Sequence, residues 1–102
     1  MIDVSAEQLA VIRAILDARV PGCKVLAFGS RANGRARKHS DLDLVVVGNT
    51  RLAFRTLAFL RADFEESTLP FRVEVLDWHR ISESFRAVID KSAVPLTLTG
   101  SG

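Results

Sequence analysis

The 102-residue chain is poor in several residue types that mark specialised classes of protein. It has one cysteine, Cys23, which cannot form a disulfide within the chain; we interpret it as a small buried hydrophobic residue at a strand start and expect a cytoplasmic, reducing environment. Tyrosine is absent. The longest apolar runs, such as Leu44–Val47, are far shorter than the roughly 20 residues of a membrane helix, so we expect no membrane association. The first residues lack a basic flank, so we also expect no secretory signal.

The net charge of +2 is too small to indicate a general nucleic-acid binder. The length and the balance of 48% hydrophobic and 25% charged residues predict one globular domain, residues 1–102. The distribution of charge is more informative than its sum. Basic residues cluster within nine positions, directly before the acidic pair Asp41 and Asp43, and they are Arg31, Arg35, Arg37, Lys38 and His39. A basic loop beside carboxylates suits a ligand that carries both phosphate and metal.

Alternating helical and strand patterns predict a layered α/β domain. Ser5 and Gln8 read as a capping box that begins a helix of about fifteen residues. The segment 31–40 is expected to form a short helix followed by a basic turn, and the tail from Ala93 either adds an edge strand or docks on a partner. The remaining predicted elements are strands Lys24–Phe28, Leu42–Val47 and Phe71–Leu76 and helices 51–65 and Ser82–Lys91, the last with Phe85, Val88 and Ile89 inward.

Gly29 and Ser30 stand where the first predicted strand ends. Glycine lets the backbone approach a ligand closely, the serine hydroxyl can donate to a phosphate oxygen, and the amides of a helix start favour anions. Arg31 and Arg35 of the same loop are therefore candidate nucleotide-binding residues together with Gly29 and Ser30. A P-loop is excluded because Arg35-Ala36 stands where Lys-Ser/Thr is required, and a dinucleotide fingerprint is excluded because Ser30 follows Gly29.

Asp41 and Asp43 occupy positions i and i+2 of a predicted strand, so both side chains leave the same face. Two carboxylates about 6–7 Å apart at the backbone repel each other unless a cation lies between them. Oxygen ligands suit Mg²⁺ or Mn²⁺, and pairs of such ions serve in-line attack at phosphorus. We therefore predict that Asp41 and Asp43 are metal ligands and catalytic residues.

A third carboxylate is expected from a neighbouring strand. In Phe71–Leu76, Glu74 lies on the polar face, whereas Asp77 has the opposite parity at the strand end. We predict Glu74 as the third metal ligand and catalytic acid and Asp77 as a cap of the following turn; Asp77 as the third acid remains the alternative.

This order of residues resembles the signature of the DNA polymerase β-like nucleotidyltransferase superfamily: Gly29-Ser30, ten intervening residues, then Asp41-x-Asp43. The short length and residues 70–77 are similar to the minimal nucleotidyltransferases of prokaryotes, and the resemblance covers roughly residues 8–90. It implies an α/β (α+β) nucleotidyltransferase fold, with a small mixed sheet of three to four strands backed by helices. It also implies Mg²⁺ at Asp41 and Asp43 and the triphosphate of ATP at Gly29 and Ser30. The third acid of the family is normally Asp, where this chain has Glu74.

Minimal members commonly pair with a separate helical HEPN-family protein in toxin–antitoxin modules and act as antitoxins by adding AMP to a tyrosine of the toxin. The resemblance therefore implies AMP transfer from ATP to a hydroxyl of a partner protein. The alternative is a non-catalytic antitoxin that keeps a nucleotide site and masks its partner, and Glu74 favours it. A basic RNA-binding module would leave Asp41 and Asp43 repelling phosphate. Base preference, acceptor and oligomeric state, a homo-oligomer included, stay open.

Overall fold

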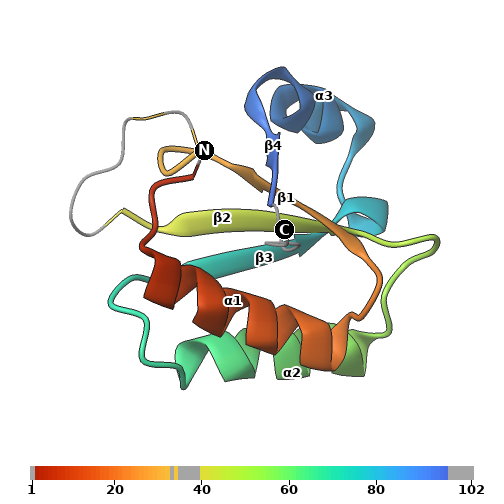
Figure 1. Ribbon diagram of the computed structural model, residues 1–102. Coiled ribbons are helices and arrows are strands. Elements are labelled where there is room, and N and C mark those ends of the chain that lie inside the picture. Colours follow the sequence, from red (N-terminus) through yellow and green to blue (C-terminus); the bar gives the residue numbers. More distant parts are fainter. Residues whose placement is uncertain (1, 33, 35–39, 97–102) are drawn as a thin grey trace.

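The computed structural model describes residues 2–32, 34 and 40–96 (Figure 1). The elements follow one another as α1 (Ala6–Arg19), β1 (Lys24–Phe28), β2 (Leu42–Val47), α2 (Phe54–Glu65), β3 (Val73–Asp77), the 3-10 helix η1 (Trp78–Arg80), α3 (Glu83–Ser92) and β4 (Val94–Pro95). The strands form one sheet in the order β3-β2-β1-β4. β1 runs antiparallel to β2 and to β4, whereas β2 and β3 are parallel. The predicted small mixed sheet with helices is confirmed.

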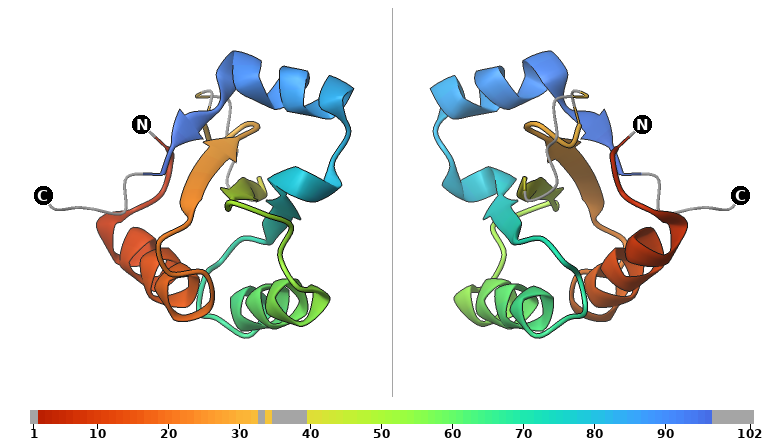
Figure 2. Two further views of the ribbon diagram at one scale, coloured as in Figure 1. Left: turned by 90° about the vertical axis from the view of Figure 1, so that its right-hand side faces the viewer. Right: turned by 90° about the vertical axis from the view of Figure 1, so that its left-hand side faces the viewer.

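The sheet has helices on both faces (Figure 2). α1 and α2 lie side by side on one face, and α3 lies on the other. Every second residue of the strands points toward α1 and α2 and packs against the apolar stripes of those helices to form the main core. This core includes Leu42, Leu44, Val75, Ile12 and Leu60. On the opposite face Val45 of β2 and Ile89 of α3 are also fully buried. A second, smaller apolar layer therefore lies under α3.

The helix starts follow the local sequence signals. At α1 the capping box is present, because the Ser5 hydroxyl accepts from the Gln8 amide at 3.1 Å and the Gln8 side chain accepts from the Ser5 amide at 2.9 Å. α2 begins at Phe54, three residues later than predicted. The reason is tertiary: the Leu52 amide donates to Asp77 and the Leu52 carbonyl accepts from Arg80, so this residue is held in an extended loop.

Two predictions for the C-terminal part have different outcomes. The tail does add an edge strand, since Val94 and Pro95 pair with Ala27 and Leu26 of β1. The inward face predicted for α3 is wrong in part: Ile89 is fully buried, but Val88 is 57% exposed and Phe85 is 37% exposed. Ile89 is the fully buried residue of α3, and Phe85 makes an edge contact with the ring of Phe28.

The remaining predictions concern the loop after β1, Cys23 and membrane-spanning helices. Residues 31, 32 and 34 form turns, not the expected short helix, and most of the remaining loop, Arg35 included, lies outside the described residues. Cys23 is only partly buried at the edge of the core, not fully buried as predicted. Across residues 2–32, 34 and 40–96, every helix is too short or too polar to span a bilayer.

Candidate functional site

The turn after β1 places a glycine against an acidic side chain. Gly29 has a φ of +79°, a conformation that favours glycine, and the Ala32 amide donates to the Gly29 carbonyl at 3.0 Å to close the turn. A Cβ atom built on Gly29 would overlap the Oδ2 atom of Asp43. Glycine is therefore required twice here, for its backbone angle and for the space that the Asp43 carboxylate fills.

Asp43 lies at the centre of the candidate site because β2 has a neighbour on each side. Phe28 of β1 is its partner in the antiparallel register, and Glu74 of β3 is its partner in the parallel register. Leu42 and Leu44, which flank Asp43 along the strand, point into the main core, so Asp43 points to the opposite face. The end of β1, the start of β2 and the start of β3 meet at the left end of the sheet in Figure 1.

The acidic residues affect one another electrostatically. Partial burial raises the pKa of Asp43, and the nearby carboxylates of Asp41 and then Glu74 raise it further. Both neighbours therefore lie close enough to Asp43 to oppose its ionisation. The structure brings the three acids predicted for the site to the same end of the sheet.

Glu74 has a basic neighbour on its own strand. Its Oε2 atom lies 3.3 Å from Nη2 of Arg72, and both side chains are substantially exposed, at 43% and 74%. The Arg72 carbonyl accepts from the Leu42 amide at 2.9 Å, which continues the pairing of β2 and β3 ahead of the first residue of β3. Arg72 is thus anchored through its backbone, while its guanidinium is free to change partners.

Asp77 has a different environment from Glu74. It is 2% exposed, and its carboxylate accepts from the backbone amides of Leu52 at 2.8 Å and His79 at 3.0 Å. Nε of Arg80 lies 3.4 Å from its Oδ2 atom. The prediction that Asp77 caps the turn after β3 is confirmed, and these contacts hold its carboxylate on the face that α1 and α2 cover.

Arg31 is buried, at 7% exposed, and contacts the backbone of two distant segments. Its Nε donates to the Ser40 carbonyl at 2.8 Å, its Nη1 donates to the Asp3 carbonyl at 2.8 Å, and its guanidinium carbon lies 4.2 Å from the centre of the Phe71 ring. Arg31 thereby joins the two ends of the basic loop, since Ser40 directly precedes Asp41. Nucleotide binding by Arg31 stays a prediction, as does that by Arg35.

Sequence patterns do not reveal these arginine contacts. Arg31 bonds to residues 9 and 28 positions away in the chain, and Arg61 of α2 donates to the Val75 carbonyl at 2.9 and 3.3 Å. An arginine in a basic loop or on an exposed helix face carries no local signal for such a partner. The positions of the glycine and the aspartates could be predicted from the sequence because strand parity and spacing determine them.

Asp41, Asp43 and Glu74 are the candidate ligands of a divalent cation. Among the described residues, no group of three His, Cys, Asp or Glu side chains closes around one point, and Glu74 contacts Arg72 instead. The chemistry nevertheless fits: Asp41, Asp43 and Glu74 supply oxygen ligands only, and partial burial together with repulsion from Asp41 and Glu74 raises the pKa of Asp43. A divalent cation would remove that repulsion, so these residues fit Mg²⁺ or Mn²⁺.

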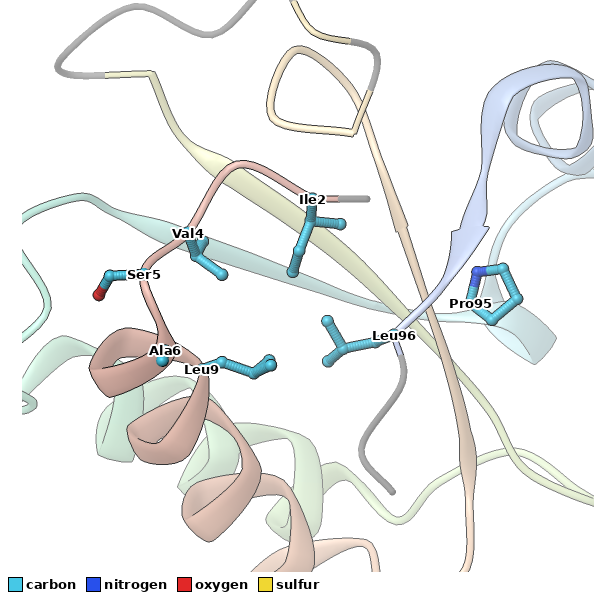
Figure 3. A pocket seen from close by; sticks show the side chains of 7 residues that line it. All are labelled: Ile2, Val4, Ser5, Ala6, Leu9, Pro95 and Leu96. Atoms are coloured by element: carbon cyan, nitrogen blue, oxygen red, sulfur yellow. The ribbon is translucent and has the colours of Figure 1, made fainter. Parts of the chain in front are cut away.

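An apolar cavity of about 380 Å³ lies elsewhere, between the N-terminal segment, α1 and the residues around β4 (Figure 3). Side chains of Ile2, Val4, Leu9 and Leu96 point toward one another across it, and among the described residues that line it Ser5 alone has a polar side chain. None of the acidic residues discussed above lines it. The cavity does not offer the charge that a nucleotide or a metal requires.

The family model described as "Polymerase beta, Nucleotidyltransferase" matches residues 12–98. The chain belongs to this family. The nucleotidyltransferase is 46% identical over 90 residues to the "Probable protein adenylyltransferase MntA" of Haemophilus influenzae, covering 88% of this chain and 79% of that protein. The resemblance to nucleotidyltransferases is therefore confirmed.

Solved structures with the same fold include a "toxin-antitoxin with AMP-PNP". It matches the nucleotidyltransferase with a TM-score of 0.73 and 21% identity, over 86% of this chain and 71% of that one. A mutant of the toxin–antitoxin MntA-HpeT matches with a TM-score of 0.72 and 19% identity, over the same shares of the two chains. At this level of identity the likeness confirms the fold of the nucleotidyltransferase and nothing further.

Proposed function

We propose that this nucleotidyltransferase transfers AMP from ATP to a hydroxyl of a partner protein in a Mg²⁺-dependent reaction, as the antitoxin of a pair with a HEPN-type toxin. The name of the Haemophilus influenzae relative, a probable protein adenylyltransferase, supports the reaction. The structural neighbours are toxin–antitoxin assemblies, one of them with AMP-PNP, and they support the partner and the nucleotide.

The position of Asp43 is the observation that carries the proposal. On one side its carboxylate fills the space that a side chain at Gly29 would occupy, and on the other side its register partner is Glu74. A triphosphate at the Gly29–Ser30 turn would therefore lie beside the acids that hold the metal. This arrangement fits phosphoryl chemistry, in which positioning and electrostatic stabilisation supply most of the catalysis.

Asp41, Asp43 and Glu74 would hold Mg²⁺. When bound, the metal neutralises the charge that develops on the phosphate oxygens and lowers the pKa of the attacking hydroxyl. Glu74 must leave Arg72 to become a ligand. This change is inexpensive, because ion pairs between exposed side chains contribute only about 0–1 kcal/mol.

The chain's own residues bind and orient the reactants. Ser30 donates its hydroxyl to a phosphate oxygen, and the Gly29 backbone allows the close approach. The acceptor oxygen forms a bond to the α-phosphorus while the bond from this phosphorus to the α,β-bridging oxygen breaks, so pyrophosphate leaves and the acceptor's proton passes to solvent. Arg31 keeps Ser40 in place and thereby positions Asp41.

Calorimetry of ATP binding tests the metal and nucleotide part of the proposal. ATP should bind in the presence of Mg²⁺ and lose most of its affinity with EDTA or in Asp41→Asn/Asp43→Asn. Ser30→Ala should weaken ATP more than adenosine, by about 1–3 kcal/mol for one charge-assisted hydrogen bond. Equal ATP affinity with and without Mg²⁺ would refute the site.

A second candidate function is an antitoxin that masks its partner without catalysis. The ion pair between Glu74 and Arg72 favours it, because the third acid already has a partner in the metal-free protein. Inhibition of the toxin by a variant that binds no Mg²⁺, with no AMP on the toxin, would support this candidate over AMP transfer.

A further inference from the structure

A polar hollow of about 500 Å³ lies along the outer edge of β3, between this strand and α2. Its apolar lining includes Phe64, Leu69 and Phe71, and four charged residues line it as well: Arg61, Glu65, Arg72 and Glu74. It therefore borders the acid that we place in the metal site. Neither Gly29 nor Ser30 lines it, so it is separate from the turn assigned to the triphosphate.

The strand order determines which reactant approaches from which side. β1, which ends at Gly29, lies on one side of β2, and β3, which carries Glu74, lies on the other. In-line attack at phosphorus requires the incoming oxygen and the leaving group on opposite sides of that atom. If the Gly29–Ser30 turn holds the departing pyrophosphate, the acceptor arrives from the β3 side. The hollow lies at this edge of the sheet on the face that α2 covers, opposite the face to which Asp43 points, so an acceptor segment bound in it reaches the metal site around the edge of β3, past Arg72 and Glu74.

Two arginines line the hollow: Arg61 is held by hydrogen bonds, whereas Arg72 can change its ion-pair partner. Arg61 donates from Nε and Nη2 to the Val75 carbonyl, so it holds α2 against the edge of β3 and occupies an outward-facing carbonyl of that strand. Arg72 is 74% exposed and pairs with Glu74 at 3.3 Å. A cation at Glu74 would take this carboxylate away from Arg72. Arg72 could then pair with an anionic group of a ligand at the rim of the hollow.

We infer that this hollow is the acceptor site of the nucleotidyltransferase and takes a hydroxyl-bearing protein segment with an acidic residue beside the hydroxyl. The acidic residue pairs with Arg72 once Glu74 binds the metal, and apolar parts of the segment lie against Phe64, Leu69 and Phe71. Metal and nucleotide therefore bind before the acceptor. The inference rests on the proposed function and adds to it the location and the charge of the acceptor.

Binding of model acceptors tests this assignment on the intact chain. The isotope-labelled protein is saturated with Mg²⁺ and α,β-methylene ATP, whose α,β bridge does not cleave, and titrated with capped pentapeptides while amide NMR shifts are followed. The peptides carry a central tyrosine or a central serine, flanked by two glutamates or, as matched controls, by two glutamines. Shifts are expected at residues 61–65 and 72–75 with the glutamate peptides, and the two central residues separate a phenolic from an aliphatic acceptor.

Variants separate the role of Arg72 from general charge. Arg72→Gln should weaken binding of the glutamate peptides by about two- to fivefold, the effect of losing one exposed ion pair, and should leave Mg²⁺–nucleotide binding intact. Arg55→Gln removes an exposed arginine of α2 that does not line the hollow and should change peptide affinity by less than about twofold. Omitting Mg²⁺ should reduce the preference for glutamate peptides, because Glu74 then keeps Arg72.

Each remaining outcome contradicts one specific claim. If millimolar peptide shifts no residue of the hollow, or if Arg72→Gln binds the glutamate peptides as the wild type does, the acceptor assignment is wrong. If the Mg²⁺–nucleotide complex does not form, the proposed function itself fails at its metal site. Nucleotide binding without peptide binding at the hollow would leave the proposed function standing and refute only the inference.

Discussion

Asp43 combines partial burial with the proximity of two other carboxylates, Asp41 and Glu74, and the three effects together raise its pKa. A raised pKa means that ionisation of this carboxylate is more costly in the folded protein than in the unfolded chain. The metal-free protein should therefore lose stability as the pH rises from the ordinary carboxyl range through the higher pKa of folded Asp43. Binding of the cation that we propose for the site should restore this stability.

The first prediction is that Asp43→Asn raises the melting temperature of the metal-free protein at neutral pH, by less than about 5 °C, which corresponds to roughly 1 kcal/mol in a domain of this size. The gain should disappear as the pH falls below the ordinary range of an aspartate carboxyl, where Asp43 is protonated in both the folded protein and the unfolded chain. Mg²⁺ should stabilise the wild type and not the variant. Thermal melts followed by the fluorescence of Trp78 across this pH range provide the measurement, and identical pH slopes for the two proteins would contradict it.

The second prediction concerns Gly29. In Gly29→Ala the added Cβ would force the Asp43 carboxylate to move, in addition to the cost of a positive φ, so we expect a loss of about 1–3 kcal/mol of stability together with a loss of Mg²⁺-dependent ATP binding. Gly22→Ala is the matched control, because Gly22 has a φ of +78° with nothing within 4 Å of its Cβ position. It should lose stability and keep ATP affinity. Equal ATP affinity in the two variants would show that the contact of Gly29 with Asp43 has no role in binding.

The third prediction distinguishes Glu74 from Asp77. Glu74→Gln should abolish AMP transfer with little change in stability, and Glu74→Asp should retain or raise transfer because it restores the usual acid of the family. Asp77→Asn should cost about 1–3 kcal/mol, since its buried oxygen atoms accept from two amides, and should leave transfer nearly unchanged. Urea denaturation and label transfer from α-labelled ATP measure the two effects. Transfer that survives Glu74→Gln but not Asp77→Asn would reverse the assignment.

At the scale of elements, local signals determine where helices begin when no distant residue interferes. The capping residues Ser5 and Ser82 place α1 and α3 within a residue or two of their predicted starts. The start of α2 could not be predicted, because Asp77 and Arg80, 25 and 28 positions further along the chain, bind the backbone of Leu52. Local sequence patterns do not reveal contacts between residues so far apart in the chain.

In the candidate site, too, the features set by local patterns could be predicted from the sequence, and the long-range contacts could not. Strand parity predicts Asp41 and Asp43 on one face and separates Glu74 from Asp77, and the structure shows the separation of Glu74 from Asp77. Nucleotide binding by Arg31 stays a prediction, and its guanidinium contacts Ser40, Asp3 and Phe71, which the sequence does not identify as neighbours. Alternation within a strand is a local property, whereas the partner of a long side chain is set by the whole fold.

The fourth prediction tests the face of α3 that packs on the sheet. Ile89 is fully buried and Val88 is 57% exposed, although the two residues are adjacent. Ile89→Ala should lower the free energy of unfolding by about 2–5 kcal/mol, whereas Val88→Ala should change it by less than about 0.5 kcal/mol. Urea denaturation monitored through Trp78 measures both. Similar losses for the two variants would mean that α3 also buries its Val88 face, for example against a partner.

At the scale of the molecule, the two ends of the sheet have different roles. At one end Gly29, Asp43 and Glu74 meet, and partial burial with the nearby charges of Asp41 and Glu74 raises the pKa of Asp43. At the other end Asp77 and His79 bind backbone atoms of the loop after β2, with His79 Nε2 donating to the Gly48 carbonyl at 2.6 Å. The polar groups that stabilise the fold are thus separated from those available for a metal and a nucleotide.

The fifth prediction concerns the product of the proposed reaction. The 102-residue chain contains no tyrosine, so AMP linked to tyrosine cannot form on the chain itself. When the protein is incubated with its toxin partner, Mg²⁺ and α-labelled ATP, the label should therefore appear on the partner, and it should depend on Asp43 and Glu74. Mass spectrometry locates the modified residue, and EDTA and the Asp41→Asn/Asp43→Asn variant serve as controls. Label on the nucleotidyltransferase would require a serine, threonine or other acceptor within the chain and would contradict transfer to a partner. If no label appears on either protein while the toxin is still inhibited, masking by binding is the function of the pair.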